Sequence, residues 1–301
     1  MSRHVFGNVV TPFGTAANNR AETEGNMTTL QKLIWHGASH STVSAEAIRF
    51  ALRRLLSEAE QTGTNRNWDE NINANTWKDH EFKGWAKENG ETFIDDDLLG
   101  FMTAEADKEE GHSGSANVRR AVLEITRAVS LTAWSGDVTF NAASPGATPS
   151  ASKGDNKSKN PVPYGTEVHA TRYQFGFAMT PERLRDSGRA AKALQALGNL
   201  RTVAGNHGRF LFDFSPESVV LRITEDPAPR LLYCFEEVDA GKSVSANALI
   251  ARIESGDVAA DEVILGTADT KSQLAESLKS VGVTVMGVKA AVNAASEQIT
   301  A

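Results

Sequence analysis

Arg49 and Arg53 are the side chains whose types and spacing best suit the binding of a charged ligand. Residues four apart share one face of a helix, and each guanidinium donates in a fork that fits phosphate oxygens. The polar run 18–20, Asn-Asn-Arg, precedes them and adds donors suited to phosphates and base edges. This layout favours RNA binding, with a pair of solvated arginines on a surface helix as the alternative.

Two patterns could in principle bind a metal ion. The acidic run Asp95-Asp96-Asp97 is better interpreted as a solvated loop, because adjacent residues in a strand point to opposite faces and rarely converge on one ion. His36 and His40 are four apart, as zinc ligands on a helix would be. A glycine lies between them and no glutamate follows the first histidine, so the metalloprotease pattern is absent. We therefore predict no metal site.

Catalytic patterns are also lacking. The run 205–209, Gly-Asn-His-Gly-Arg, resembles a phosphate-cradling turn, but no Gly-Lys-Ser/Thr follows it, and an ordinary hairpin turn is the alternative. Nucleophile-elbow and dinucleotide-binding glycine motifs do not occur. The single cysteine, Cys234, lies in an apolar run that indicates a buried strand, so it forms no internal disulfide. We predict no catalytic residue and no cofactor, in a reduced, cytoplasmic protein.

Charge is distributed unevenly along a chain whose net charge is −7. Residues 1–54 and 153–209 carry an excess of lysine and arginine, whereas residues 55–111 and 210–301 are acidic. An acidic total argues against nucleic-acid binding, but the placement of the charges matters more than their sum. The two basic blocks could form one phosphate-facing surface. The sequence has no run of apolar residues long enough to span a membrane, and no signal peptide at its start.

The elements that position these residues follow from hydrophobic periodicity. Residues 59–111 are acidic, rich in Asn and Trp and without a clear period, so they indicate an inserted subdomain. Residues 141–165 hold almost no large apolar side chain, which is typical of a functional or disordered segment. Helices are predicted over 43–58, with Ser41, Thr42 or Ser44 as the cap, and over 180–198, 245–255 and 271–281. Strands are predicted over 3–13, 118–140, 166–179, 203–214, 218–224, 229–237, 261–267 and 283–287.

Between residues 19 and 53 the sequence resembles that of a known family. Asn19-Arg20, Leu30-Gln31-Lys32 and the run 43–49 with Arg53 resemble the opening of the CRISPR Cascade backbone subunit, where a strand, an Asn-Arg loop and a basic helix follow one another. Longer strings resemble the DevR branch of type I systems: residues 6–14, 126–131, 140–146 and 210–218. The resemblance extends to about residue 237.

The resemblance implies a hand-shaped α+β protein. Its palm would be a ferredoxin-like domain of the RNA-recognition-motif type, carrying an inserted finger subdomain and a long thumb hairpin. The expected division is palm 1–54, finger region 55–117, palm strands 118–140, thumb hairpin 141–165, palm 166–237 and a C-terminal α/β portion 238–301.

The function implied is that of a non-catalytic subunit in a type I interference (Cascade) complex. Copies would polymerise head to tail along CRISPR guide RNA and hold its backbone, so that the bases pair with target DNA. A head-to-tail contact joins two different patches and propagates into a helical filament. The expected partners are guide RNA, target DNA through the guide, further copies of itself and other Cascade subunits, with no membrane.

Carried over residue by residue, the resemblance assigns an RNA-facing set. It comprises Asn19, Arg20, Gln31, Lys32, Ser44, Arg49 and Arg53. To these we add the thumb lysines Lys153, Lys157 and Lys159, and the turn residues Asn206, His207 and Arg209. Glu46 stands where the family often has glutamine, and it is left out because a carboxylate cannot donate to phosphate.

Two other functions stay open. Related backbone subunits of type III complexes cut RNA with an aspartate in the loop after the first strand. Here that loop offers Glu22 and Glu24, and a glutamate could hold Mg²⁺ for a metal-dependent ribonuclease. The DevR association also suggests a developmental transcription regulator, although no helix-turn-helix is evident.

Overall fold

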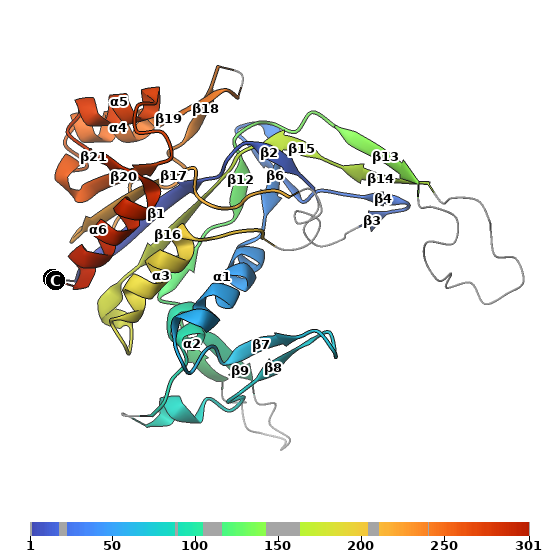
Figure 1. Cartoon of the computed structure of the whole chain (residues 1–301), viewed down its shortest axis with the longest axis vertical. Helices are drawn as coiled ribbons and strands as arrows, with labels where there is room; N and C mark the ends of the chain where they lie inside the picture. Colours follow the sequence, from blue (N-terminus) through green and yellow to red (C-terminus); the bar gives the residue numbers. More distant parts are fainter. Residues whose placement is uncertain are drawn as a thin grey trace, which may run out of the picture.

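A sheet of nine strands forms the centre of the molecule (Figure 1). The structure, a computed structural model, describes residues 2–17, 23–87, 90–104, 116–142, 163–203, 211–239 and 241–300. In spatial order the sheet comprises β21 (Thr284–Met286), β20 (Val263–Thr267), β17 (Ser218–Thr224), β1 (His4–Val10), β16 (Tyr173–Met179), β12 (Ala128–Ser130), β6 (Ala38–Val43) and β5 (Lys32–Trp35), with β11 (Leu123–Ile125) beside β16.

Strand β1 lies at the middle of this sheet and contributes buried apolar side chains to both faces, Val5 and Val9 to one and Phe6 and Val10 to the other. It pairs antiparallel with β16 and with β17, and nearly all of its residues are buried. Near-continuous burial of this kind requires cover on both faces of the sheet. Gly7 is required here, since a Cβ at this position would lie 2.3 Å from the ring of Phe177. The strands around β1 are antiparallel, whereas β20 and β21 at the edge of this sheet run parallel.

Helices cover the two faces of the sheet and build two hydrophobic cores. One face carries α1 (Ala45–Ala59), α2 (Ile94–Leu99), α3 (Arg189–Gly198) and α6 (Val288–Thr300). The other carries α4 (Asn247–Glu254) and α5 (Gln273–Ser280). Short 3-10 helices are η1 (Lys83–Ala86), η2 (Pro181–Arg183) and η4 (Ala260–Glu262).

Smaller sheets form the projections from this centre. A four-stranded sheet extends to one side of the molecule, and two hairpins lie beyond α1 (Figure 1). The projecting sheet comprises β13 (Val138–Ala142), β14 (Pro163–Glu167), β4 (Met27–Thr28) and β3 (Thr23–Glu24). The hairpins are β7 (Arg66–Asp69) with β8 (Ala74–Trp77), and β9 (Phe101–Ala104) with β10 (Ala116–Arg119). Two further pairs are β2 (Gly14–Ala16) with β15 (His169–Thr171), and β18 (Glu236–Val238) with β19 (Ser243–Ser245).

The α+β class predicted from the sequence is confirmed. Most predicted elements of the palm and of the last third are present within a few residues of their expected bounds. The predicted helix 180–198 is wrong in its first half, where η2 is followed by turns before α3 begins at Arg189. The strand predicted over 203–214 is absent from its described part after residue 210, and 229–237 is strand only from Glu236. Helix α6 was not predicted, because its buried stripe is built largely from alanines.

Candidate nucleic-acid interface

Helix α1 positions Arg49 and Arg53. Its apolar side, with Ile48, Leu52 and Leu56 fully buried, packs into the core. The side chain of Ser44 accepts a hydrogen bond from the backbone N–H of Ala47 at 3.3 Å, which caps the helix. Ser44 is itself buried, so its hydroxyl caps the helix and does not face the solvent.

Arg49 and Arg53 leave α1 on the flank of this buried side, and both are partly buried. The Nε of Arg49 is buried and has no hydrogen-bond partner among the described residues. The Nε of Arg53 lies 3.4 Å from a carboxylate oxygen of Asp95. Burial lowers the pKa of Arg53, and Asp95 opposes that shift. Arg49 therefore has unused donor capacity, whereas Arg53 is partly committed to the acid behind it.

Gln31 and Lys32 lie at the approach to α1. The carbonyl of Gln31 accepts a 2.7 Å hydrogen bond from the N–H of Thr42, two residues before the helix cap. The ammonium of Lys32 pairs with Glu167 at 2.5 Å and lies 4.0 Å from the ring centre of Trp134. The structure thus brings both near the N-terminus of α1, and Lys32 is engaged by the strand β14. The remaining predicted RNA-facing residues lie outside the described ranges: Asn19, Arg20, Lys153, Lys157, Lys159, Asn206, His207 and Arg209.

A cavity of about 270 Å³ between α1 and the β7–β8 hairpin was missed by the sequence argument. Its wall includes Arg53, the neighbouring Arg54, and Arg66 and Trp68 from the hairpin. Trp68 is 46 % exposed. In the sequence, the one pattern that could have indicated this cavity is the tryptophan-rich segment that follows a helix with clustered arginines.

The interpretation of Asp95-Asp96-Asp97 as a solvated loop is wrong. These residues form helix α2, and all are buried. Asp95 accepts backbone hydrogen bonds from Asn65 at 2.7 Å and Arg66 at 3.2 Å, which fix the start of β7. Burial and the neighbouring Asp95 raise the pKa of Asp96 to about 7.

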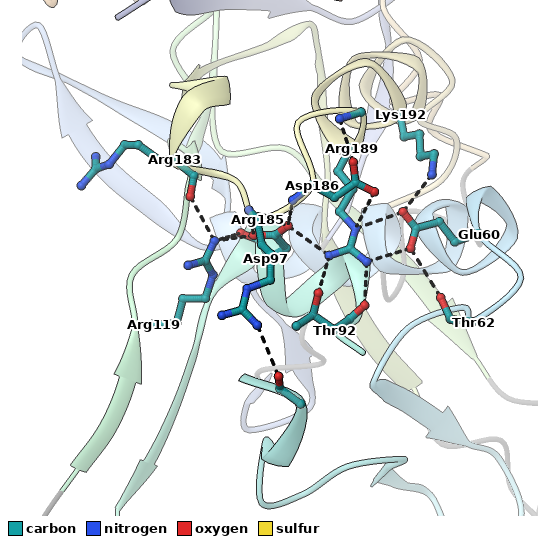
Figure 2. A network of polar contacts seen from close by, with 12 residues as sticks. Glu60, Thr62, Thr92, Asp97, Arg119, Arg183, Arg185, Asp186, Arg189 and Lys192 are labelled. Carbon is teal, nitrogen blue, oxygen red and sulfur yellow. Dashed lines mark hydrogen bonds and ion pairs between the residues drawn. The ribbon is translucent and has the colours of Figure 1, made fainter. Parts of the chain in front are cut away.

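Asp97 of α2 is the centre of a buried network that joins α2 and β10 to α3 (Figure 2). It forms ion pairs with Arg119 and with Arg189, the latter at 3.0 Å. It also accepts the backbone N–H groups of Arg185 and Asp186. Capture of these two N–H groups by Asp97 explains why the predicted helix begins only at residue 189. The three aspartates therefore do not converge on one ion, and each accepts from donors of the protein itself.

Arg189 completes the network on the side of α1. Its guanidinium donates to both carboxylate oxygens of Glu60, at 3.0 and 3.1 Å, as well as to Asp97 and Thr92 (Figure 2). Lys192 adds a 2.8 Å contact to Glu60. Burial opposes ionisation of Glu60, but hydrogen bonds from Arg189 and Lys192 hold its pKa below the usual value. Arg189 and Lys192 of α3 therefore both direct their charge toward Glu60.

His36, His40 and Cys234 lie in a turn or in the protein interior, away from any ligand site described above. His36 lies with Gly37 in the two-residue turn of the β5–β6 hairpin, both with positive φ, and His40 is buried on β6. The pair is therefore not on a helix. In the described part of the chain no group of three or more His, Cys, Asp or Glu is arranged to hold a metal ion. Burial raises the pKa of Cys234 to about 12, so its thiol is unreactive. Within the same ranges no helix combines the length and apolar character needed to cross a membrane.

Comparison with known proteins places the chain in a family. The family model described as CRISPR-associated negative auto-regulator DevR/Csa2 matches residues 11–238. A curated relative from Myxococcus xanthus (strain DK1622), CRISPR-associated protein Cas7/Cst2/DevR, is 62% identical over 267 residues, which are 88% of this chain and 87% of the relative. The chain belongs to the DevR/Csa2 family of CRISPR-associated proteins, and the predicted resemblance to the DevR branch is confirmed.

Solved structures share the fold. One chain from a CRISPR RNA-guided surveillance complex matches with a TM-score of 0.58 and 15% identity, covering 98% of this chain and 99% of that one. Another, from such a complex described as pre-nicking, matches with a TM-score of 0.54 and 13% identity, covering 97% and 100%. The likeness includes the region after residue 238, which the family model does not match.

Proposed function

We propose that this chain is a non-catalytic backbone subunit of a type I CRISPR interference complex. Copies of it polymerise head to tail along guide RNA and hold the backbone, which leaves bases free to pair with target DNA. The observation that carries this proposal is the basic flank of α1, where the partly buried Arg49 and Arg53 share one side of the helix in a chain 62% identical to a Cas7/Cst2/DevR protein. Contacts to phosphates are independent of sequence, as a subunit that holds variable guides requires.

A ferredoxin-like palm is part of this proposal. Its support is the order of the four strands that alternate with α1 and α3 along the chain. Along the chain these strands are β1, β12, β16 and β17. In the sheet they lie in the order β17-β1-β16-β12, which is fourth, first, third and second, and neighbouring strands are antiparallel. That is the arrangement of the β-α-β-β-α-β fold. The finger is then the insert around α2 and β7–β10, and the thumb is the segment carried by β13 and β14.

The remaining partners follow from the same proposal. The thumb of one copy reaches the next copy, and other subunits close the ends of the filament. A filament forms because the two contacting patches differ, so each new copy offers a free end. Such a complex works in the cytoplasm, where guide RNA is made.

Substitution of the two arginines tests the proposal. Arg49→Ala and Arg53→Ala should each weaken RNA binding for unrelated spacers alike and make it less sensitive to salt, because phosphate contacts are lost. Arg53→Ala should also cost about 1–3 kcal/mol of folding free energy, since it leaves Asp95 with one partner fewer. Filter binding at several salt concentrations, with urea unfolding alongside, measures both. A loss confined to one spacer sequence contradicts backbone recognition.

Nucleic acid copurified with the full chain gives a second test. Sequencing should return CRISPR repeat-spacer RNA of mixed spacer content. A protein that carries no nucleic acid and binds no RNA when it is added would refute the proposal.

Two alternatives have direct tests. For a ribonuclease, Glu22 lies outside the described residues, and Glu24 is exposed on β3. Cleavage of complementary RNA in Mg²⁺ that disappears in Glu22→Gln or Glu24→Gln would favour it. The family description names a negative auto-regulator, and specific binding to promoter DNA without RNA would favour that role.

A further inference from the structure

We propose that the cavity between α1 and the β7–β8 hairpin binds one unpaired nucleobase of the strand that α1 holds. This inference rests on the proposed function and adds a subsite to it. The cavity has a volume of about 270 Å³. That lies just under the roughly 300–1,000 Å³ of cavities that enclose drug-sized molecules, so its size suits one planar ring system.

The cavity has an aromatic wall suited to stacking. Trp68 on β7 lines the cavity with nearly half of its surface exposed, although it is large and apolar. Phe50 of α1 meets it edge to face, with ring centres 6.2 Å apart and ring planes at 79°. Phe50 therefore restrains the indole and leaves the remaining indole surface free. A nucleobase can stack on such a surface whatever its identity.

The polar groups of the cavity suit a base better than a phosphate alone. Arg54 is exposed and forms no ion pair with a described carboxylate, so its guanidinium can donate. Arg66 is held in place, since its Nε donates to Asn75 at 3.0 Å. Glu58 and Glu70 also line the cavity and supply acceptors. A lone phosphate would be repelled by these carboxylates, whereas the edge of a base carries both donors and acceptors.

The cavity lies on the path of the proposed RNA. Arg53 forms part of its wall, and Arg49 is one helical turn earlier on the same flank of α1. A strand whose phosphates lie along this flank passes the mouth of the cavity. A base that is turned out of the pairing register can then enter it, while its phosphate stays beside Arg49 and Arg53.

Photocrosslinking of the full chain with guide RNA tests this subsite. The RNA carries 5-iodouridine at one position at a time, and crosslinked peptides are identified by mass spectrometry. We expect a crosslink to Trp68 from a subset of positions, and its loss in Trp68→Leu. The matched control is Trp77→Leu, because Trp77 is 41 % exposed on the partner strand β8 and does not line the cavity. That control should keep the crosslink.

Affinity provides the second readout. For a short single-stranded RNA, Trp68→Leu should weaken binding by about 5- to 150-fold, as loss of one stacked base does, and Trp77→Leu should change it little. If Trp68→Leu fails to fold, Arg54→Ala on the exposed side of α1 is used instead and should lower the crosslink yield at Trp68. RNA bound at full affinity with no crosslink to Trp68 from any position overturns the subsite and leaves the proposed function standing. Absence of RNA binding overturns both.

Discussion

Two groups of arginines near α1 differ in what surrounds them. In the network around Asp97, the side chain of Arg189 is 6 % exposed and is shared by Glu60, Asp97 and Thr92. In the cavity beyond α1, Arg54 is exposed and has no ion pair to a described carboxylate. The first group consumes its donors inside the protein. The second keeps its donors for a ligand.

This difference explains how an acidic chain can keep an arginine such as Arg54 exposed and without an ion pair to a described carboxylate. The acidic block 55–111 holds several of its carboxylates in the interior, where Asp95 faces Arg53 and Asp97 faces Arg119 and Arg189. Buried and paired, these acids contribute little field at the surface of α1. Net charge alone therefore misjudges such a protein, and the partners of each charge decide what remains for nucleic acid.

The largest expected effect comes from breaking the buried network. Asp97→Ala should lower the free energy of unfolding by about 3–5 kcal/mol, because it leaves Arg119 and Arg189 as buried cations with a missing partner. Urea unfolding measures the change. The control is Glu276→Ala, which removes an exposed ion pair to Lys279 and should cost no more than about 1 kcal/mol. Equal effects of the two variants would contradict the role given to the network.

A smaller effect is expected from Asp96, and it depends on pH. Burial raises its pKa from 3.8 to about 7, so the folded protein keeps a proton that the unfolded chain releases. The stability that this carboxyl contributes is therefore present at low pH and is lost as the pH rises through about 7. Between about pH 5 and pH 8, the free energy of unfolding of the wild type should fall by on the order of 2 kcal/mol relative to that of Asp96→Asn.

Thermal or urea unfolding across this pH range provides the measurement. Glu297→Gln removes an exposed carboxyl from α6 and controls for the loss of one charge. If the difference in unfolding free energy between wild type and Asp96→Asn does not change with pH, Asp96 is ionised over the whole range. Its burial beside Asp95 then does not raise its pKa.

The sequence predicted the regions where local pattern decides the structure. Helix α1 has a strong apolar period and a serine at its start, so both its position and the shared flank of Arg49 and Arg53 could be anticipated. The family strings predicted the α+β class and the family itself. These features depend on residues that are close together in the chain.

The buried network could not be anticipated, because its partners are distant in sequence. Asp97 meets Arg189 across 92 positions, and Asp95 meets the N–H of Asn65 across 30. Adjacent aspartates on a short helix point in different directions, so each can face its own donors, whereas the sequence pattern alone favoured a loop. The cavity was missed for the same reason, since Trp68 meets Phe50 only once the hairpin folds back on α1.

The smallest expected effect separates exposed arginines that face the cavity from those that do not. Arg54→Ala should make the salt dependence of RNA binding shallower by about 0.7 in log–log slope per subunit, if its guanidinium neutralises one phosphate of a single strand. Arg252→Ala removes an equally exposed arginine from α4, on the opposite face of the sheet, and should leave the slope unchanged. Neither variant should alter the unfolding curve, because neither side chain takes part in the buried network. A slope unchanged by Arg54→Ala, with a shallower slope in Arg252→Ala, would move the RNA path to the other face.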